Sequence, residues 1–261
     1  MNESTFAPRL DLPNTGVIIT GGASGIGLAC AHALAAVGRP VAIWDINESG
    51  AVAAAAELRK TYPAAAVGLH VDLRDPSAIA TAAQRSREAL HTIGGLVHSA
   101  GTVEVTGIEG VTPDNWDAGM NLHLRALLLL VQAVLPDLKA NAGSAIVAIA
   151  SINATLGAGS IPIYTAAKAG VLGLVRSMAD ELGHHDIRIN AISPGVIDTP
   201  IVEPTFKVIP REHFARRIQL GRIGRAEEIG RGVRFLLSSE ASYLTAAEIV
   251  IDGGNITSQR G

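Results

Sequence analysis

The stretch Val17-Ile-Ile-Thr20-Gly-Gly-Ala-Ser24-Gly-Ile-Gly27 carries a short apolar run through a glycine-rich turn into an Ala-rich segment. We expect a buried strand, a turn and the start of a helix. Glycines leave no Cβ in the way, so backbone N–H groups at the helix start can face a pyrophosphate. The spacing Gly-x-x-x-Gly-x-Gly departs from the dinucleotide fingerprint, and alone it also suits an ordinary tight turn. Its strand–turn–helix context favours a dinucleotide cradle.

Apolar strand-like runs alternate with Ala-rich helical segments along the rest of the chain. Continuous apolar strands separated by helices predict a parallel α/β sheet covered on both faces. With no linker or repeat, residues 1–261 are expected to form one domain. Strands are expected near 17–20, 40–45, 66–71, 96–98, 145–149, 187–192 and 247–251, and helices near 25–38, 48–61, 76–91, 113–139, 160–183 and 226–238.

Composition and charge exclude several classes of protein. Apolar residues make up 48% of the chain and the net charge is −3, so nothing indicates a nucleic-acid partner. The single Cys30 excludes an internal disulfide framework and fits a reducing compartment. The first residues lack the features of a signal peptide, and the longest apolar run, 126–135, is too short to span a bilayer. We therefore expect a cytoplasmic protein without a membrane partner.

Tyr164 and Lys168 stand four residues apart in the segment 160–183, so on a helix they share one face. A lysine charge about 4 Å away stabilises a phenolate by roughly 4 kcal/mol at an effective dielectric of about 20. That amount would bring a phenol toward neutrality as a proton carrier. A tyrosine at a helix start beside an exposed lysine is the plain structural alternative. The apolar face of this helix is expected to comprise Ile161, Ala167, Val171, Leu174 and Met178.

Two acidic residues follow predicted strands. Asp45 ends the second strand, where a carboxylate can accept from a ribose 2′-OH and would repel a 2′-phosphate. Asp72 follows the third strand and could reach the adenine. Each could instead cap the helix that follows it. Together with the glycine turn, Asp45 indicates NAD rather than NADP, since no arginine or lysine stands beside it in the sequence.

These residues, with further motifs in the same order and spacing, resemble the short-chain dehydrogenase/reductase family over nearly the whole chain. The resemblance implies a Rossmann-type, doubly wound parallel sheet of about seven strands. It also implies a single-step hydride transfer between a nicotinamide and a carbonyl/alcohol pair. The matching pieces are Thr20–Gly27, Asp45, Asp72-Leu73, Ala100-Gly101, Asn121, Ser151, Tyr164-x-x-x-Lys168, Pro194-Gly195 with Thr199, and Ile251-Asp-Gly-Gly254.

The resemblance assigns a role to each of four catalytic candidates. Tyr164 would be the general acid/base, and Lys168 would lower its pKa and hold the nicotinamide ribose. Ser151 would orient the substrate oxygen, which agrees with its position directly after an apolar strand. Asn121 would hold a water that extends a proton relay from Lys168. A serine leaving a strand and a mildly unfavourable mid-helix asparagine are the structural alternatives.

The cofactor residues that the resemblance implies extend from the adenine to the nicotinamide. Backbone near Ile197 would meet the nicotinamide carboxamide, and Thr199 would hold the pyrophosphate side. No metal-ligand set is apparent. The residues expected to bind NAD are Gly21, Ser24, Gly25, Ile26, Gly27, Asp45, Ile46, Asp72, Leu73, Ser99, Ala100, Gly101, Tyr164, Lys168, Pro194, Gly195, Ile197 and Thr199.

One stretch departs from the family pattern. Asn-Asn-Ala-Gly is usual after the fourth strand, and this chain has His98-Ser99-Ala100-Gly101. We expect His98 to be a hydrogen-bonded structural histidine and not a catalyst. His184 and His185 are expected in a surface turn.

The resemblance implies that residues 196–224 cover the substrate, and such a segment can act as a mobile lid. Its charged side chains Arg211, Glu212, Arg216 and Arg217 suit a solvated helix face, although the arginines could also meet an anionic substrate. The candidates for the pocket wall are Val103, Glu104, Asn153, Leu156, Ile161 and Val196.

The sequence therefore predicts an NAD-dependent secondary-alcohol dehydrogenase or ketone reductase that acts on a small molecule. The resemblance also implies a homotetramer, with helices near 113–139 and 160–183 packing across subunits. One alternative is a 3-oxoacyl-(acyl-carrier-protein) reductase, although Asp45 argues against its usual NADPH. A nucleotide-binding regulator without turnover is the other, and the presence of Ser151, Tyr164 and Lys168 together disfavours it.

Overall fold

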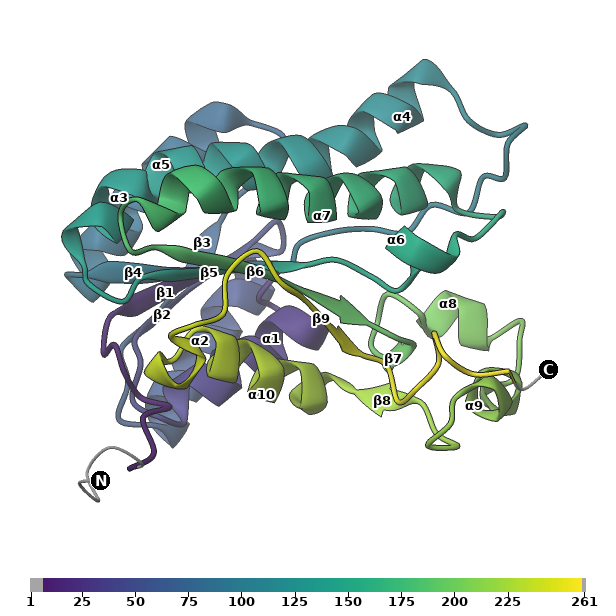
Figure 1. Ribbon diagram of the computed structural model, residues 1–261. Coiled ribbons are helices and arrows are strands. Elements are labelled where there is room, and N and C mark those ends of the chain that lie inside the picture. Colours follow the sequence, from purple (N-terminus) through teal and green to yellow (C-terminus); the bar gives the residue numbers. More distant parts are fainter. Residues whose placement is uncertain (1–6, 260–261) are drawn as a thin grey trace.

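Seven parallel strands pair in the order β3-β2-β1-β4-β5-β6-β9 in the computed structural model, which describes residues 7–259 (Figure 1). This order confirms the doubly wound, Rossmann-type sheet. The strand at 96–98 begins earlier than expected, at Ile93. The strands are β1 (Gly16–Thr20), β2 (Val41–Asp45), β3 (Ala66–His70), β4 (Ile93–His98), β5 (Ala145–Ile149), β6 (Arg188–Pro194) and β9 (Glu248–Ile251).

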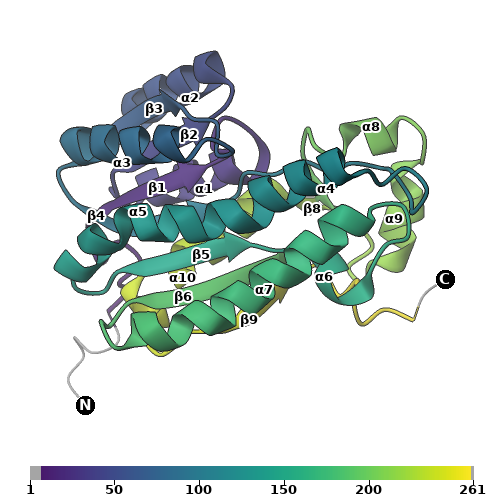
Figure 2. The same cartoon turned by 90° about the horizontal axis from the view of Figure 1, so that it is seen from above.

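Helices cover both faces of the sheet, as Figures 1 and 2 show. One layer holds α3 (Pro76–Leu90), α5 (Ala126–Ala140) and α7 (Pro162–Gly183). The other holds α1 (Gly25–Ala35), α2 (Glu48–Thr61) and α10 (Ala226–Leu236). Successive side chains of β1 point to opposite faces, so Ile18 joins the first core while Val17 and Ile19 join the second. Both cores are built mainly from Ala, Val, Ile and Leu.

The chain reverses its winding direction between β1 and β4. Thr20, at the end of β1, pairs with Trp44 on one side and His98 on the other. The residues that follow, Asp45 and Ser99, therefore emerge at one edge of the sheet. In doubly wound sheets, ligands bind outside the carboxyl ends of the strands at this switch point.

The helix expected near 113–139 contains an irregularity that the sequence did not reveal. A π-helical turn, Asn121–Arg125, joins α4 (Pro113–Met120) to α5, and the N–H of Ala126 donates to the carbonyl of Asn121. Such a turn holds one residue more than an α-helical turn and is frequent at functional sites. Apolar periodicity averages over such a local change and so cannot indicate it.

The combined helix Pro113–Ala140 is longer than the apolar run considered in the sequence. By length and composition alone it could cross a bilayer, with a mean hydropathy of 1.5 in its most apolar window. Its second half instead buries Leu127, Leu130 and Val134 in the core beside the sheet. We therefore describe it as a core helix.

Helix α7 buries part of the face that was expected. Ile161, Ala167 and Val171 are buried as predicted, whereas Leu174 and Met178 are only partly buried against the core. Ile163 and Val175 are buried in addition. The buried face also contains Lys168, which is 3% exposed. The helix is therefore rotated so that a charged side chain enters the interior together with the apolar ones.

The segment 196–224 lies at the carboxyl end of the sheet (Figure 1). Its strand β7 (Ile197–Asp198) pairs with β8 (Gly224–Arg225), and α8 (Glu203–Phe206) and α9 (Arg211–Arg217) lie between them in the sequence. The sequence did not predict these short elements, nor α6 (Asn153–Leu156) and the 3₁₀ turn η3 (Ser239–Ala241).

Two arginines hold the carbonyl end of α10. Arg39 is fully buried and donates to the carbonyls of Leu237 and Thr15. Arg188 donates to the carbonyls of Leu236 and Ser238. Cations are favoured at this helix end. Burial, and then the charge of Arg188, lower the pKa of Arg39 to about 10.

Candidate active site

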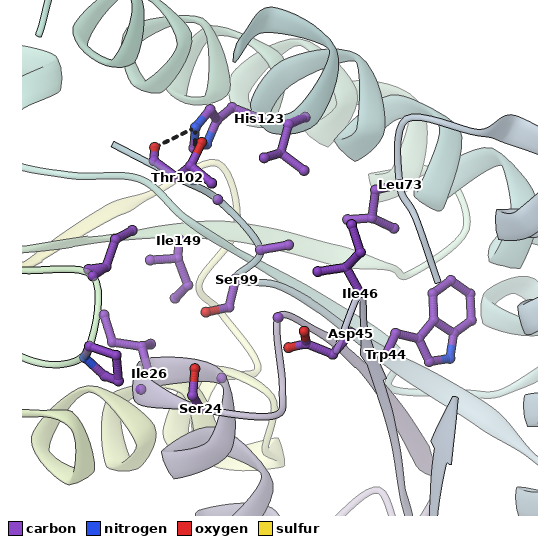
Figure 3. A pocket seen from close by; sticks show the side chains of 18 of the residues that line it. Ser24, Ile26, Trp44, Asp45, Ile46, Leu73, Ser99, Thr102, His123 and Ile149 are labelled. Carbon is purple, nitrogen blue, oxygen red and sulfur yellow. Dashed lines mark hydrogen bonds between the residues drawn. The ribbon is translucent and has the colours of Figure 1, made fainter. Parts of the chain in front are cut away.

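A cavity of about 430 Å³ opens at the carboxyl ends of the strands (Figure 3). Its size suits a small molecule or cofactor. It extends from the glycine turn to the start of α7 and brings together most of the predicted cofactor residues. Those that line it are Gly21, Ser24, Gly25, Ile26, Gly27, Asp45, Ile46, Asp72, Leu73, Ser99, Ala100, Gly101, Tyr164, Lys168 and Thr199.

Three predicted cofactor residues do not line this cavity. Pro194 ends β6, the N–H of Gly195 donates to the carbonyl of Ile251, and Ile197 is buried in β7. Their contacts with a nucleotide stay predictions.

Other residues of the lining were not among the predicted site residues. Trp44 and Ile149 sit at strand ends, so position at the carboxyl edge was an available signal for them. The missed residues are Trp44, Val71, Arg74, Thr102, Ala118, Leu122, His123, Ile149, Pro200 and Ile201.

The start of α1 is free to bind an anion. Its N-cap residue, Ser24, makes no side-chain cap, and the first turn contains no acidic residue. Helix starts leave N–H groups without backbone partners, which phosphate oxygens can accept from. Gly27 is required here because a Cβ would lie 2.1 Å from the carbonyl oxygen of Gly21. This end of the cavity fits a nucleotide pyrophosphate.

Asp45 links the glycine turn to the following helix. Its carboxylate accepts from the N–H of Ala23 at 3.0 Å and from the N–H of Asn47 at 2.9 Å. A carboxylate has about four lone-pair sites, so it can still accept from a ribose hydroxyl. The structural role and the nucleotide role are therefore compatible.

Arg74 lines the cavity but is paired with Asp72. Its guanidinium donates to both oxygens of that carboxylate, and the shortest contact is 2.6 Å. The hydrogen bond from Arg74 is the main reason why the pKa of Asp72 is lowered. An adenine that binds Asp72 would thus compete with this arginine.

Ser151, Tyr164 and Lys168 meet where β5 ends. Ser151 is buried two residues beyond β5 and hydrogen-bonds with Tyr164. The ammonium of Lys168 donates to the carbonyl of Ile149 at 2.6 Å and lies 5.6 Å from the centre of the Tyr164 ring. Burial lowers the pKa of Lys168 to about 8. The three side chains therefore lie together at the end of β5, and their catalytic roles stay predictions.

The pKa of Tyr164 does not follow the sequence-based expectation. Burial raises it, because a phenolate is poorly solvated there, and the hydrogen bond with Ser151 acts in the opposite direction. The charge of Lys168 is not among the causes of the shift. The predicted lowering is therefore not found in this arrangement, in which the ammonium donates to the carbonyl of Ile149.

Asn121 begins the π turn and does not line the cavity. Its part in a proton relay stays a prediction. The buried residue of this turn that does line the cavity is His123, whose ring packs edge-on against Tyr164 at 5.5 Å and 88°. Its Nε2 lies 3.0 Å from the carbonyl of Thr102, the contact drawn in Figure 3. Burial, then Lys168 and His98, lower the pKa of His123 to about 3, so the ring is neutral.

His98 is the hydrogen-bonded structural histidine that was predicted. The hydroxyl of Thr20 accepts from the N–H groups of Ser99 and Ala100, so its own hydrogen is left for Nδ1 of His98, 3.0 Å away. The proton of His98 is then on Nε2, which donates to the carbonyl of His123 at 3.1 Å. His98 thus ties β1 and β4 to the π turn.

Arg211, Arg216 and Arg217 do not line the cavity. Arg211 pairs with Asp198 at 2.6 Å and stacks on Phe206, while Arg216 and Arg217 are exposed on α9. Of the predicted pocket-wall residues, Glu104 lines the cavity, and the others are absent from its lining.

His184 and His185 are exposed, as expected for a surface turn. Within residues 7–259, no group of three or more His, Cys, Asp or Glu side chains could hold a metal ion.

Comparison with known proteins gives consistent matches over nearly the whole chain. A family model described as enoyl-(acyl carrier protein) reductase matches residues 21–255. The chain is 36% identical to levodione reductase of Leifsonia aquatica (96% of this chain, 97% of the relative). It is 35% identical to a probable galactose dehydrogenase of Rhizobium meliloti (94% and 96%).

A solved structure also matches nearly the whole chain. It is the NADPH-bound structure of a short chain oxidoreductase from Pseudomonas aeruginosa PAO1, described as containing an atypical catalytic center. It matches with a TM-score of 0.87 at 30% identity, over 95% of this chain and 98% of that one.

The lowered pKa of Lys168 predicts a pH-dependent stability. The unfolded lysine binds its proton up to about pH 10.5, the folded one only to about pH 8, so stability should rise with pH between these values. From about pH 7 to 10.5, the free energy of unfolding of the wild type should rise by roughly 3 kcal/mol relative to Lys168→Met. Urea denaturation of both proteins at both pH values measures the difference between their free energies of unfolding. A difference that does not change with pH would show that Lys168 keeps its ordinary pKa.

Proposed function

The chain belongs to the short-chain dehydrogenase/reductase family and is an oxidoreductase, and on this premise we propose that it uses NAD to interconvert a secondary alcohol and a ketone. The observation that carries the proposal is the convergence of Ser151, Tyr164 and Lys168 at one end of a cavity. The uncapped start of α1 and Asp45 line the other end.

Ser151, Tyr164 and Lys168 would each have a distinct role in the reaction. A bound nicotinamide would supply or accept the hydride. Tyr164 would take the proton of the substrate hydroxyl during oxidation and return it to the carbonyl oxygen during reduction. The hydroxyl of Ser151 would donate to the same oxygen. Because burial raises the pKa of Tyr164, the nearby charge of Lys168 would be needed to stabilise the phenolate.

Asp45 supports NAD as the cofactor. Its carboxylate lines the cavity beside the glycine turn, where it would accept from a ribose hydroxyl and repel a 2′-phosphate. The next residue, Ile46, is 59% exposed and has no charge to offer a phosphate. Arg74, the arginine of the lining, is paired with Asp72. One relative was solved with NADPH, so the choice needs a direct test.

A 3-oxoacyl-(acyl-carrier-protein) reductase is the second candidate within the family. The description of the matching family model, which names an acyl carrier protein, favours it. A panel of secondary alcohols, ketones and 3-oxoacyl thioesters, followed by NADH absorbance with both cofactors, separates the candidates. Activity on none of them would favour a nucleotide-binding regulator.

We also propose that the protein is a cytoplasmic homotetramer in which α4, α5 and α7 pack across subunits. Trp116 on α4 and Leu128 on α5 are 40% and 39% exposed, and subunit contact would cover them. Sedimentation of the purified protein tests this assembly, and a monomer would contradict it. Residues 196–224 would act as the lid over the substrate.

Tyr164→Phe should lower kcat by about 10²- to 10⁴-fold, the range typical of a lost general acid/base. NAD binding should persist, because the ring and its packing against His123 remain. Steady-state kinetics and NADH fluorescence measure the two effects. Near-normal turnover in this variant would refute the acid/base role.

Asp45→Ala should lower the preference for NAD over NADP, since the variant neither accepts from the ribose nor repels a phosphate. A change of about tenfold corresponds to roughly 1.4 kcal/mol, the scale of one such contact. The ratio of kcat/KM with the two cofactors measures it. Asp72→Ala is the matched control at the adenine side, where affinity for both cofactors should change alike. An unchanged ratio in Asp45→Ala would remove the argument for NAD.

A further inference from the structure

Glu104 is an acidic side chain at the reacting end of the site. It lines the main cavity, and together with Tyr164 it also lines an adjoining cavity of about 10 Å³. That volume is about the size needed for one water molecule or one hydroxyl group. The remaining walls of this small cavity are Thr102, Gly119, His123 and Ile163. The other acids of the lining, Asp45 and Asp72, lie at the adenosine end.

The carboxylate of Glu104 is available to a ligand. Within residues 7–259, no hydrogen-bond donor or cation is paired with it. The cations that line the main cavity are both engaged, Arg74 by Asp72 and Lys168 by the carbonyl of Ile149. A carboxylate with no compensating cation accepts hydrogen bonds and repels anions.

His123 gives the same corner a second acceptor. Its Nε2 lies 3.0 Å from the carbonyl oxygen of Thr102 and 3.4 Å from the N–H of the same residue. Because the shorter contact joins two acceptors unless Nε2 carries the proton, we assign the proton to Nε2, which leaves a lone pair on Nδ1. This Nδ1 is buried and has no hydrogen-bond partner among the described residues. Because Nδ1 of His123 is buried, a ligand would contact the carboxylate of Glu104 and not this nitrogen. The lone pair of Nδ1 still disfavours a further hydrogen-bond acceptor in the small cavity. The group that fits there is therefore a hydrogen-bond donor.

We propose that Glu104, beside His123, forms a subsite for a second hydroxyl group of the substrate, next to the carbon that is oxidised. The substrate class is a neutral vicinal diol or the corresponding hydroxyketone. This inference rests on the proposed function, because Tyr164, which would hold the reacting oxygen, shares the small cavity with Glu104. The same carboxylate disfavours substrates that carry a carboxylate or phosphate near the reacting carbon.

The test compares vicinal diols with mono-alcohols of the same carbon skeleton. With NAD in excess, kcat/KM is measured for 2,3-butanediol against 2-butanol and for 1,2-cyclohexanediol against cyclohexanol. The variants are Glu104→Ala, Glu104→Gln and the matched control Glu109→Gln. Glu109 is exposed in the same loop and lines neither cavity.

The wild type should prefer the diol of at least one pair by about tenfold, a modest ratio because the carboxylate is solvent-exposed before binding. Glu104→Ala should lower this preference by about tenfold. Glu104→Gln should keep part of it, because the amide oxygen still accepts. Glu109→Gln should match the wild type. A wild type that prefers the mono-alcohols, or a preference that survives in Glu104→Ala, overturns the proposal.

If the protein oxidised none of these alcohols, the result would count against the proposed function but not by itself against the subsite. Thermal denaturation with NADH present then tests the subsite separately. The diol should stabilise the wild type more than its mono-alcohol does, and this difference should disappear in Glu104→Ala. Equal stabilisation by both alcohols in the wild type would overturn the subsite.

Discussion

The burial of one ammonium group determines much of this structure. Lys168 is 3% exposed, and its recorded partner is the backbone carbonyl of Ile149 rather than a carboxylate. A buried charge is costly unless hydrogen bonds compensate for it. Helix α7 must therefore hold a fixed position over the end of β5. Ser151, two residues beyond that strand, and Tyr164, one turn before Lys168, are brought together by the same requirement.

The buried charge also constrains its neighbours. His98 and His123 both have a pKa lowered to about 3, with Lys168 the second cause after burial in each case. Two neutral rings beside one cation avoid a second unpaired charge in the interior. Being neutral, His98 can accept from Thr20 and donate to the carbonyl of His123. His98, which departs from the family pattern, thus supports the π turn, and this turn holds His123 against Tyr164.

Much of this could be predicted from the sequence, for identifiable reasons. The parallel sheet and its two helical layers follow from apolar runs, which act locally, whereas the Rossmann-type arrangement and most of the cofactor residues came from the family resemblance. The position of Lys168 on the buried face of α7 could not be predicted, because apolar periodicity counts only apolar residues and included Leu174 and Met178 in their place. The pairing of Arg74 with Asp72 and the packing of His123 on Tyr164 depend on side-chain conformation and on a π turn. No pattern of residue types encodes either one.

The π turn sets the rotational phase of the helix on either side of it. Each residue of an α-helix advances the direction of its side chains by about 100°. The extra residue in Asn121–Arg125 offsets α4 from α5 by that angle, so Ala118 lines the cavity while Leu127 and Leu130 meet the sheet. Loss of one residue here would leave a regular helix whose two halves keep their present directions, whereas a regular α-helix that retained the residue would turn one half by that angle. The π turn therefore absorbs one additional residue while α4 keeps Ala118 at the cavity and α5 keeps Leu127 and Leu130 at the sheet.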